Sequence, residues 1–255
     1  MLLTDQSLCQ LDGLSPNAEV ALRNQGIWTA RQLAFQADNL FSPLHAARIK
    51  ESFLRFELFR KLGLVDALVK SFPCGHRVRV LADYLQQAMF LDIESTGTML
   101  NKSHITCISI YRNGVFSSFV RGNNLPDFLQ EWAATKLVVT FNGKRFDIPM
   151  LLREFRFTTI PAHIDLMEEA SHFGYKGGLK SIEKQIGFQR KENVGEDGQT
   201  AVYLWHNYKN DNSLDVLDKL LLYNREDVRS LTFLWRIILK CSLENTGIPL
   251  PRIKL

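Results

Sequence analysis

The feature that most constrains the fold is the stretch at residues 88–97, where an apolar run leads into two acidic residues and a Gly-containing turn. Such a run is typical of a strand that starts inside a core and ends at a surface. Alternate residues of a strand share a face, so Asp92 and Glu94 point the same way while Leu91 and Ile93 pack. Half-buried carboxylates repel each other unless a cation lies between them. The stretch predicts a divalent-cation site or, as the plainer interpretation, two solvated residues at a strand end.

Size and composition set broad limits on the chain. With 255 residues, 45% of them hydrophobic, it can form one large domain or a mid-sized domain plus a small one. A net charge of +4 is only weak support for a polyanionic partner. The four cysteines lack CxxC spacing, which predicts free thiols in a reducing compartment. No stretch reaches transmembrane length, so we expect a cytoplasmic protein without a membrane partner.

Residues 1–85 are expected to form a smaller all-α domain in front of a larger domain at residues 86–255. Ser15, followed by a proline, is typical of a helix N-cap with a favourable first helical residue. Apolar positions between residues 52 and 69 predict one long amphipathic helix. The Pro- and Gly-containing break at residues 71–75 ends this helix and indicates the domain boundary.

Two of the N-terminal helices are joined by a Gly-containing turn at residues 26–29, where Thr29 caps the second helix. The pattern resembles the helix-hairpin-helix module, whose turn offers backbone N–H groups to phosphate oxygens. A small helical bundle that only packs is an equally good interpretation. On the following helix, Arg48 and Lys50 would face a phosphate backbone or water. A third possibility is docking of a repair or RNA-processing protein through exposed aromatics such as Trp28.

The pattern beyond the first strand predicts the fold class. Apolar runs at residues 105–111 and 114–120 flank the pair Asn113-Gly114, which favours a hairpin. The elements expected next are a helix at 126–134, a buried strand at 136–143, a helix at 147–155 and a strand at 160–166. The order βββαβαβα predicts an α/β chain with a mixed five-stranded sheet flanked by helices, the arrangement of the ribonuclease H-like fold.

A third acid, Asp147, follows the predicted strand at residues 136–143. The commoner role of an aspartate between a strand and a helix is to cap the helix N-terminus. If this strand lies beside the strand of Asp92, however, the two strand ends meet at one edge of the sheet. That neighbourhood would place a third carboxylate near the first two.

The fourth acid lies on a helix expected at residues 220–234, where apolar residues recur with helical spacing. Tyr223 and Asp227 are four residues apart, so they lie side by side on one face of that helix. An ordinary surface pair is the alternative, and an isolated Tyr/Asp pair of this kind carries little information.

Taken together, the four acids and the tyrosine resemble the DEDD superfamily of 3′→5′ exonucleases, in the subclass that carries a tyrosine. Its three motifs are matched, in order, by residues 92–97 (DxExTG), by Asn142 with Asp147, and by Tyr223 with Asp227 (YxxxD). Three motifs in the right order are far more specific than any one of them. The resemblance covers residues 86–240. It narrows to the bacterial YprB-like ribonuclease H-like domains, which residues 178–183, Asp197-Gly198 with Leu204-Trp205, and residues 222–228 resemble.

This resemblance implies a two-metal hydrolase. Carboxylate oxygens suit Mg²⁺ or Mn²⁺ rather than zinc or iron. Asp92 would bridge two ions, Glu94 and Asp227 would complete the first site, and Asp147 would hold the second. The ions would activate a water and stabilise the leaving 3′ oxygen, and Tyr223 would orient that water.

The resemblance also implies the substrate contacts. Asn142 and the backbone near Thr96 would hold the terminal nucleotide, and Lys144 and Arg145 would meet phosphates. The products would be nucleoside monophosphates released from a free 3′ end of single-stranded DNA or RNA, with DNA slightly favoured. The competing hypothesis is a non-catalytic nucleic-acid-binding or adaptor protein that keeps the nuclease fold.

Overall fold

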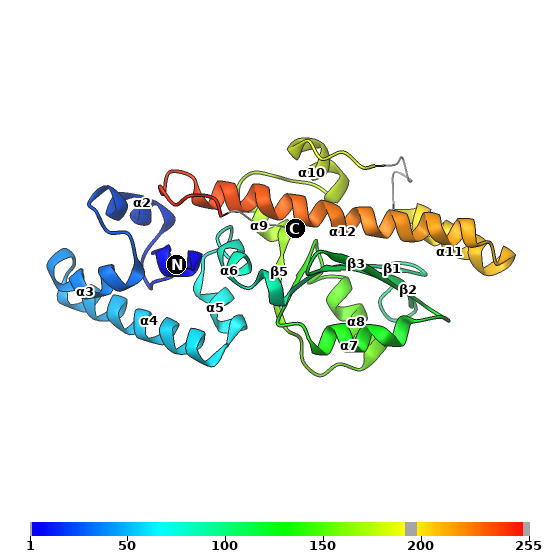
Figure 1. Ribbon diagram of the computed structural model, residues 1–255, viewed down its shortest axis with the longest axis horizontal. Helices are drawn as coiled ribbons and strands as arrows, with labels where there is room; N and C mark the ends of the chain where they lie inside the picture. Colours follow the sequence, from blue (N-terminus) through cyan, green and yellow to red (C-terminus); the bar gives the residue numbers. More distant parts are fainter. Residues whose placement is uncertain (1, 192–197, 252–255) are drawn as a thin grey trace.

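The computed structural model describes residues 2–191 and 198–251 and places a five-stranded mixed sheet between layers of helices (Figure 1). The strands are β1 (Ala88–Ser95), β2 (Ile105–Arg112), β3 (Val115–Val120), β4 (Leu137–Thr140) and β5 (Ala162–Asp165), in the spatial order β3-β2-β1-β4-β5. β1, β2 and β3 are antiparallel neighbours, whereas β4 runs parallel to both β1 and β5. The predicted fold class, a ribonuclease H-like mixed sheet flanked by helices, is confirmed.

The described residues also form twelve α-helices and two short 3₁₀ helices. The α-helices are α1 (Leu3–Gln6), α2 (Pro16–Asn24), α3 (Ala30–Leu40), α4 (Pro43–Leu62), α5 (Val65–Ser71), α6 (Val78–Asp83), α7 (Phe128–Ala133), α8 (Asp147–Phe155), α9 (Leu166–His172), α10 (Leu179–Ile186), α11 (Gly198–Asp211) and α12 (Leu214–Leu243). The 3₁₀ helices are η1 (Leu85–Gln87) and η2 (Leu125–Asp127). No described helix is both long and apolar enough to cross a bilayer.

The local signals in the sequence are mostly confirmed. Ser15 caps α2 by accepting from the N–H of Ala18 at 3.1 Å, and Thr29 caps α3 in the same way. Asn113 (φ +52°) and Gly114 (φ +83°) both adopt the left-handed conformation that a two-residue hairpin turn requires. Tight strand connections therefore occur where the sequence predicts them.

The prediction of one long helix over residues 52–69 is wrong. α4 begins earlier, at Pro43, and ends at Leu62, and a separate helix, α5, follows. Gly63 causes the break, because it adopts a left-handed conformation (φ +66°) that ends a helix. Apolar residues recur on both sides of the break, which is why the periodicity by itself did not indicate it.

β1 lies at the centre of the sheet, and its two faces contact different layers. Ala88 and Phe90 pack in a cluster that contains Trp235 of α12, whereas Leu91 and Ile93 pack in the cluster of α7 and α8. Figure 1 shows α12 crossing one face of the sheet, with α7 and α8 on the other. Because alternate residues share a face, the residues that follow Phe90 at the same spacing point toward α12.

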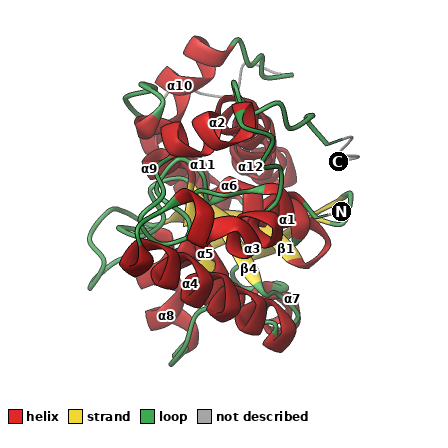
Figure 2. Cartoon of the chain, turned by 90° about the vertical axis from the view of Figure 1, so that its left-hand side faces the viewer, coloured by secondary structure: helices red, strands yellow, loops and turns green. Residues whose placement is uncertain are grey.

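The N-terminal helices have a core of their own and are also joined to the sheet domain. Arg79 of α6 is fully buried, pairs with buried Glu19 of α2 at 2.7 Å, and donates from Nε to Ser242 of α12 at 2.8 Å. α6 therefore links the N-terminal helices to the C-terminal end of α12. Figure 2 shows the N-terminal helices from their own side of the molecule. A boundary at residue 85 stays a prediction.

Candidate functional site

Three carboxylates meet at the C-terminal end of β1. Asp92 and Glu94 continue the face of β1 that points toward α12, and Asp227 of α12 lies opposite them. One oxygen from each of the three carboxylates lies within 4.8 Å of the others. The structure thus brings together three of the four predicted acids, two from neighbouring positions of a strand and one from a distant helix.

α12 contributes two further side chains at this point. Tyr223 is buried and lies one helical turn before Asp227. Asn224, which is completely buried, donates from Nδ2 to Oδ2 of Asp92 at 2.6 Å. Asn224 was not predicted as a site residue, because its contact with Asp92 depends on where α12 crosses β1. This hydrogen bond fixes the rotation of the Asp92 carboxylate.

Asp147, the fourth acid, occupies the gap that opens between β1 and β4. These strands pair only as far as Phe90 and Val139, so the N–H of Ile93 has no partner in β4. Oδ1 of Asp147 accepts from that N–H at 3.2 Å. Asp147 is the first residue of α8 and Phe146 holds the N-cap position, so the N-cap alternative is wrong. It lies outside the group of three acids whose oxygens are within 4.8 Å of one another.

Burial raises the pKa of all four acids. Burial is the main cause at Asp92 and Glu94, whose pKa values are raised well above the ordinary range, and neighbouring carboxylates add to it. The pKa of Asp147 is raised to about 7 and that of Asp227 to about 6, where the charge of Arg190 opposes the effect of burial. The cluster therefore favours bound protons or cations.

This donor set fits a divalent cation. Its oxygens are all carboxylate oxygens, which hard cations such as Mg²⁺ and Mn²⁺ prefer over nitrogen or sulfur ligands. A cation would also relieve the repulsion that raises the pKa values of these acids. Among the described residues, the acidic, histidine and cysteine side chains that lie close enough together to share an ion are those of Asp92, Glu94 and Asp227.

Two cationic side chains that the sequence analysis did not select lie against the cluster. Nζ of Lys180, on α10, donates to the hydroxyl of Tyr223 at 2.8 Å and lies 4.3 Å from the centre of its ring. Arg190 forms ion pairs with both Glu183 and Asp227. Lys180 and Arg190 are distant in sequence from every acid of the cluster, so their contacts with it were found only in the structure.

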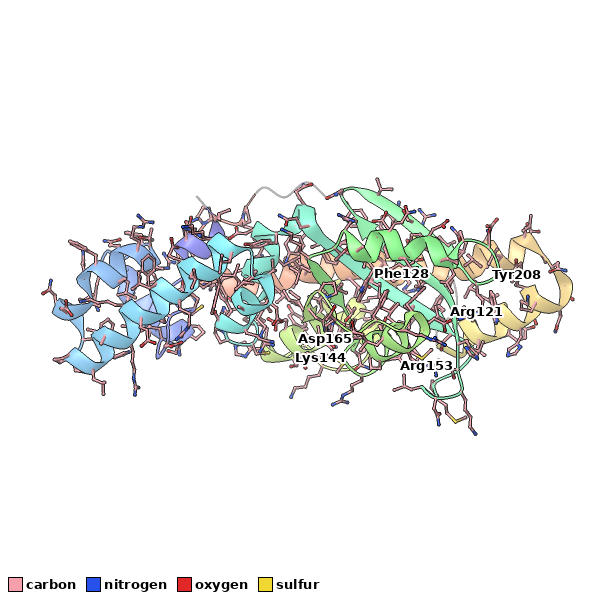
Figure 3. All side chains as sticks on the ribbon, turned by 90° about the horizontal axis from the view of Figure 1, so that it is seen from below. Arg121, Phe128, Lys144, Arg153, Asp165 and Tyr208 are labelled. Carbon is pink, nitrogen blue, oxygen red and sulfur yellow. The ribbon has the colours of Figure 1, made fainter. Side chains whose placement is uncertain are left out.

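The turn that carries Asn142 is held by a buried acid that sequence reasoning also missed. Asp165, at the end of β5, accepts from the N–H of Asn142 at 2.7 Å and from that of Lys144 at 3.1 Å. Asn142 adopts a left-handed conformation (φ +59°), and within the described chain its Oδ1 is buried without a hydrogen-bond partner. Figure 3 shows Asp165 and Lys144 side by side. An aspartate near the end of the strand predicted at residues 160–166 was the available signal.

The remaining predicted substrate contacts lie in the segments that follow β1 and β4. The N–H of Thr96 donates to His104 at 2.9 Å, and its hydroxyl accepts from the N–H of His104 at 3.0 Å. Lys144 is exposed and ion-paired with Glu168, and Arg145 is exposed. The proposed roles of these residues in binding nucleic acid stay predictions. The N–H and the hydroxyl of Thr96 already have partners within its own loop.

The N-terminal turn at residues 26–28 uses its own backbone donors. Each of its three N–H groups has an acceptor within the chain. The acceptors are, in order, the carbonyls of Arg23 (2.9 Å) and Leu22 (3.1 Å) and Oε1 of Gln32 (2.9 Å). Lys50 is ion-paired with Asp38, whereas Arg48 is exposed. These contacts support packing rather than phosphate binding at this turn.

Comparison with known proteins gives a family for the central part of the chain. The sequence model RNase_H_2, described as the RNase_H superfamily, matches residues 89–238. This segment begins at Met89 in β1 and ends in α12, so it contains all four acids and Tyr223. None of the curated proteins compared with the chain matches it.

Several solved structures are similar at low identity. The family B DNA polymerase of the archaeon Pyrobaculum calidifontis is 18% identical over 61% of this chain, with a TM-score of 0.46, and the chain spans only 24% of its length. A nuclease in its apo form is 20% identical over 64% of this chain and 76% of its own, with a TM-score of 0.43. Brucella melitensis NrnC bound to pGG is 17% identical over 66% of this chain and 89% of its own, with a TM-score of 0.34. Because these TM-scores are below 0.5, the assignment depends on the family match.

Proposed function

We propose, since the chain belongs to the RNase H superfamily, that it is a metal-dependent 3′→5′ exonuclease that releases nucleoside monophosphates from single-stranded nucleic acid. The observation that carries the proposal is the meeting of Asp92, Glu94 and Asp227 within 4.8 Å, next to Tyr223. A phosphodiester bond has no good leaving group in water at neutral pH, so a nuclease needs charge stabilisation of this kind.

The acids would hold two ions, Mg²⁺ or Mn²⁺, in the arrangement that the DEDD resemblance implies. Asp92 would contact both ions, Glu94 and Asp227 one, and Asp147 the other. Bound ions would supply Lewis-acid stabilisation of the phosphate and of the leaving 3′ oxygen. Asn224 contributes by keeping the Asp92 carboxylate in one orientation through its hydrogen bond of 2.6 Å.

Tyr223 is suited to orient a water molecule rather than to remove its proton. Burial raises the pKa of its phenol well above the ordinary value, and the charges of Asp227 and Glu94 raise it further. The hydroxyl is therefore protonated at neutral pH and acts through hydrogen bonds. Lys180, at 2.8 Å, fixes the position of the phenol oxygen.

Asn142 is the best-placed candidate for gripping the terminal nucleotide. Its Oδ1 is a buried acceptor without a partner among the described residues, and a hydroxyl of the terminal sugar would satisfy it. Single strands are favoured, because the reacting phosphate must reach carboxylates that are half-buried between β1 and α12. DNA is slightly favoured over RNA as the substrate.

The test is a cleavage assay on matched polymers. Single-stranded DNA and RNA of one sequence, each labelled at the 5′ end, are incubated with the protein in Mg²⁺, Mn²⁺ or EDTA. We expect a ladder that shortens from the 3′ end, requires the metal and is absent with Asp92→Ala. The ratio of the DNA and RNA rates gives the sugar preference.

A matched control is Asp127→Ala, which removes an acid of η2 in the layer of helices on the face of the sheet opposite α12. Cleavage that survives Asp92→Ala would refute the proposed site, and cleavage from the 5′ end would refute the polarity. Intact binding without cleavage of either polymer would favour the competing hypothesis of a non-catalytic nucleic-acid-binding protein.

The N-terminal helices are proposed to act as a packing and docking unit for a protein partner in the cytoplasm. Trp28 is 50% exposed, and Phe35 on α3 is 88% exposed, so both rings are accessible to a partner. Affinity for a single-stranded oligonucleotide that is unchanged by Arg48→Glu would support this role. A marked loss of affinity would instead favour a helix-hairpin-helix clamp.

A further inference from the structure

Arg190 joins the acid cluster to a second, buried acid. It follows α10 and reaches α12, so that its guanidinium contacts both Glu183 of α10 and Asp227. Nε donates to Oε2 of Glu183 at 2.9 Å and Nη2 donates to Oε1 at 2.7 Å. This two-point contact fixes the plane of the guanidinium group, because the fork of Arg matches the two oxygens of a carboxylate.

The third nitrogen of this guanidinium group indicates that a ligand binds here. Nη1 of Arg190 is buried and, among the residues that the structure describes, has no hydrogen-bond partner. A buried cationic donor without an acceptor costs free energy, so such groups normally have a partner in the working state of a protein. The missing partner must be an acceptor, and an anion would satisfy it best.

The ion pair between Arg190 and Asp227 conflicts with the proposed metal site. A divalent cation on Asp227 would lie close to the guanidinium, and two positive groups at one carboxylate repel each other. Glu183 is buried and contacts Arg190 through both of its oxygens, so it can keep the guanidinium in place when Asp227 binds the ion. The N–H of Nη2 that now contacts Asp227 would then be available to a ligand, together with Nη1, while Nη2 keeps its bond to Glu183.

Space for an anion lies beside Asp227, the partner of Arg190. A pocket of about 260 Å³ opens between α10 and α12 and is lined by Lys180, Ser181, Tyr223 and Asp227. Lys180 adds a second positive charge beside the pocket. A phosphate group placed there would lie beside the carboxylates that hold the ions.

We propose that Arg190 is a phosphate-binding residue. In the metal-free protein Arg190 is ion-paired with Asp227. When Asp227 binds a divalent cation, Arg190 stays bound to Glu183 and donates a hydrogen bond to a phosphate oxygen of the nucleic acid. This inference rests on the proposed function, because it names a further residue of the same site. Arg190 thereby links metal binding to substrate binding.

The test compares Arg190→Gln with wild type in two binding assays that need no cleavage. Mn²⁺ affinity is measured on the protein alone by calorimetry. Affinity for a 5′-labelled single-stranded oligothymidylate is measured by fluorescence anisotropy in Ca²⁺. We expect the variant to bind Mn²⁺ several-fold more tightly, because a competing cation is gone. We expect it to bind the oligonucleotide about tenfold or more weakly, the loss for one charge-assisted hydrogen bond.

Arg229→Gln is the matched control, because Arg229 also pairs with a buried glutamate on α12 and donates to the carbonyl of Gln189 beside Arg190. It is expected to leave both affinities near those of wild type. A merely structural role of Arg190 would lower both affinities together. If thermal unfolding shows that Arg190→Gln does not fold, Arg190→Lys is used, which keeps the charge and loses the fork.

The inference is overturned if the oligonucleotide binds the Arg190 variant as tightly as wild type, or if wild type does not bind it at all. Failure of the proposed function is a different result, namely wild type that binds the oligonucleotide and does not cleave it. In that case a loss of binding in the variant still supports the role of Arg190.

Discussion

Replacing Asp92 by Asn should change stability in opposite directions with and without a metal ion. Asp92 lies within 4.8 Å of Glu94 and Asp227, and burial together with these charges raises its pKa. Asn has the same shape and keeps an oxygen that can accept from Asn224, so the change removes mainly a charge. We therefore expect Asp92→Asn to unfold at a higher temperature than wild type in EDTA, and at a lower one in Mg²⁺ or Mn²⁺.

The magnitude in EDTA follows from the spacing of the carboxylates. Two full charges 4.8 Å apart repel by about 3.5 kcal/mol at an effective dielectric constant of about 20. Asp92 avoids part of this cost by holding a proton, so the expected gain in the free energy of unfolding is about 1–3 kcal/mol. For a chain of this size, each kcal/mol corresponds to about 2–4 °C in Tm.

The magnitude with metal follows from ligand linkage. An ion that binds only the folded protein stabilises wild type by about 2.7 kcal/mol when its concentration is about 100 times its Kd. The variant lacks the carboxylate that would contact both ions, so it should gain little from the same addition. The two unfolding curves are expected to exchange their order when EDTA is replaced by Mg²⁺.

Differential scanning fluorimetry at pH 8, with and without the metal, measures all four melting temperatures. Asp127→Asn, away from the cluster, serves as the control and should respond to metal as wild type does. Equal stabilisation of wild type and Asp92→Asn by the metal would refute the assignment of Asp92 as a ligand. A variant less stable than wild type in EDTA would refute the repulsion that we infer among the acids.

Three further predictions concern other parts of the structure. Glu19→Ala should lower the free energy of unfolding in urea by about 3–5 kcal/mol, since it leaves the fully buried Arg79 without its carboxylate; no change would mean that the pair is not buried in solution. Asp165→Ala should reduce the cleavage rate more than oligonucleotide affinity, because the turn at Asn142 loses its acceptor; equal losses in both would count against a positioning role. In EDTA, stability should fall as pH rises from 4 to 7, by at most about 4 kcal/mol, because the folded-state pKa of Asp147 is about 7 instead of 3.8; Asp147→Asn should flatten this slope in pH-dependent melting curves.

Local sequence patterns predicted most of the fold. The apolar run before Asp92, the Asn113-Gly114 turn and the caps at Ser15 and Thr29 each act over a few residues, and all four lie where the sequence indicated. The break at Gly63 was missed, because the apolar spacing of α4 continues into α5 and hides a single left-handed residue.

The candidate site could be predicted only in part, because contacts between distant segments complete it. Alternation along β1 was enough to place Asp92 and Glu94 on one face, and helical spacing was enough to pair Tyr223 with Asp227. Bringing these two pairs together required the crossing of α12 over β1, which no local pattern encodes. The partners Asn224 and Arg190 follow from that crossing, so they were found only in the structure.

The sequence by itself thus determined which acids, together with Tyr223, are candidates for the site and on which elements they lie, since both depend on residue type and short-range spacing. The tertiary structure decided which charges meet. Asp147 fills the gap where β1 and β4 separate, and Arg190 reaches Asp227 while Glu183 holds its guanidinium. These contacts depend on distances across the fold, which are set by how helices and strands pack rather than by the order of residues along the chain.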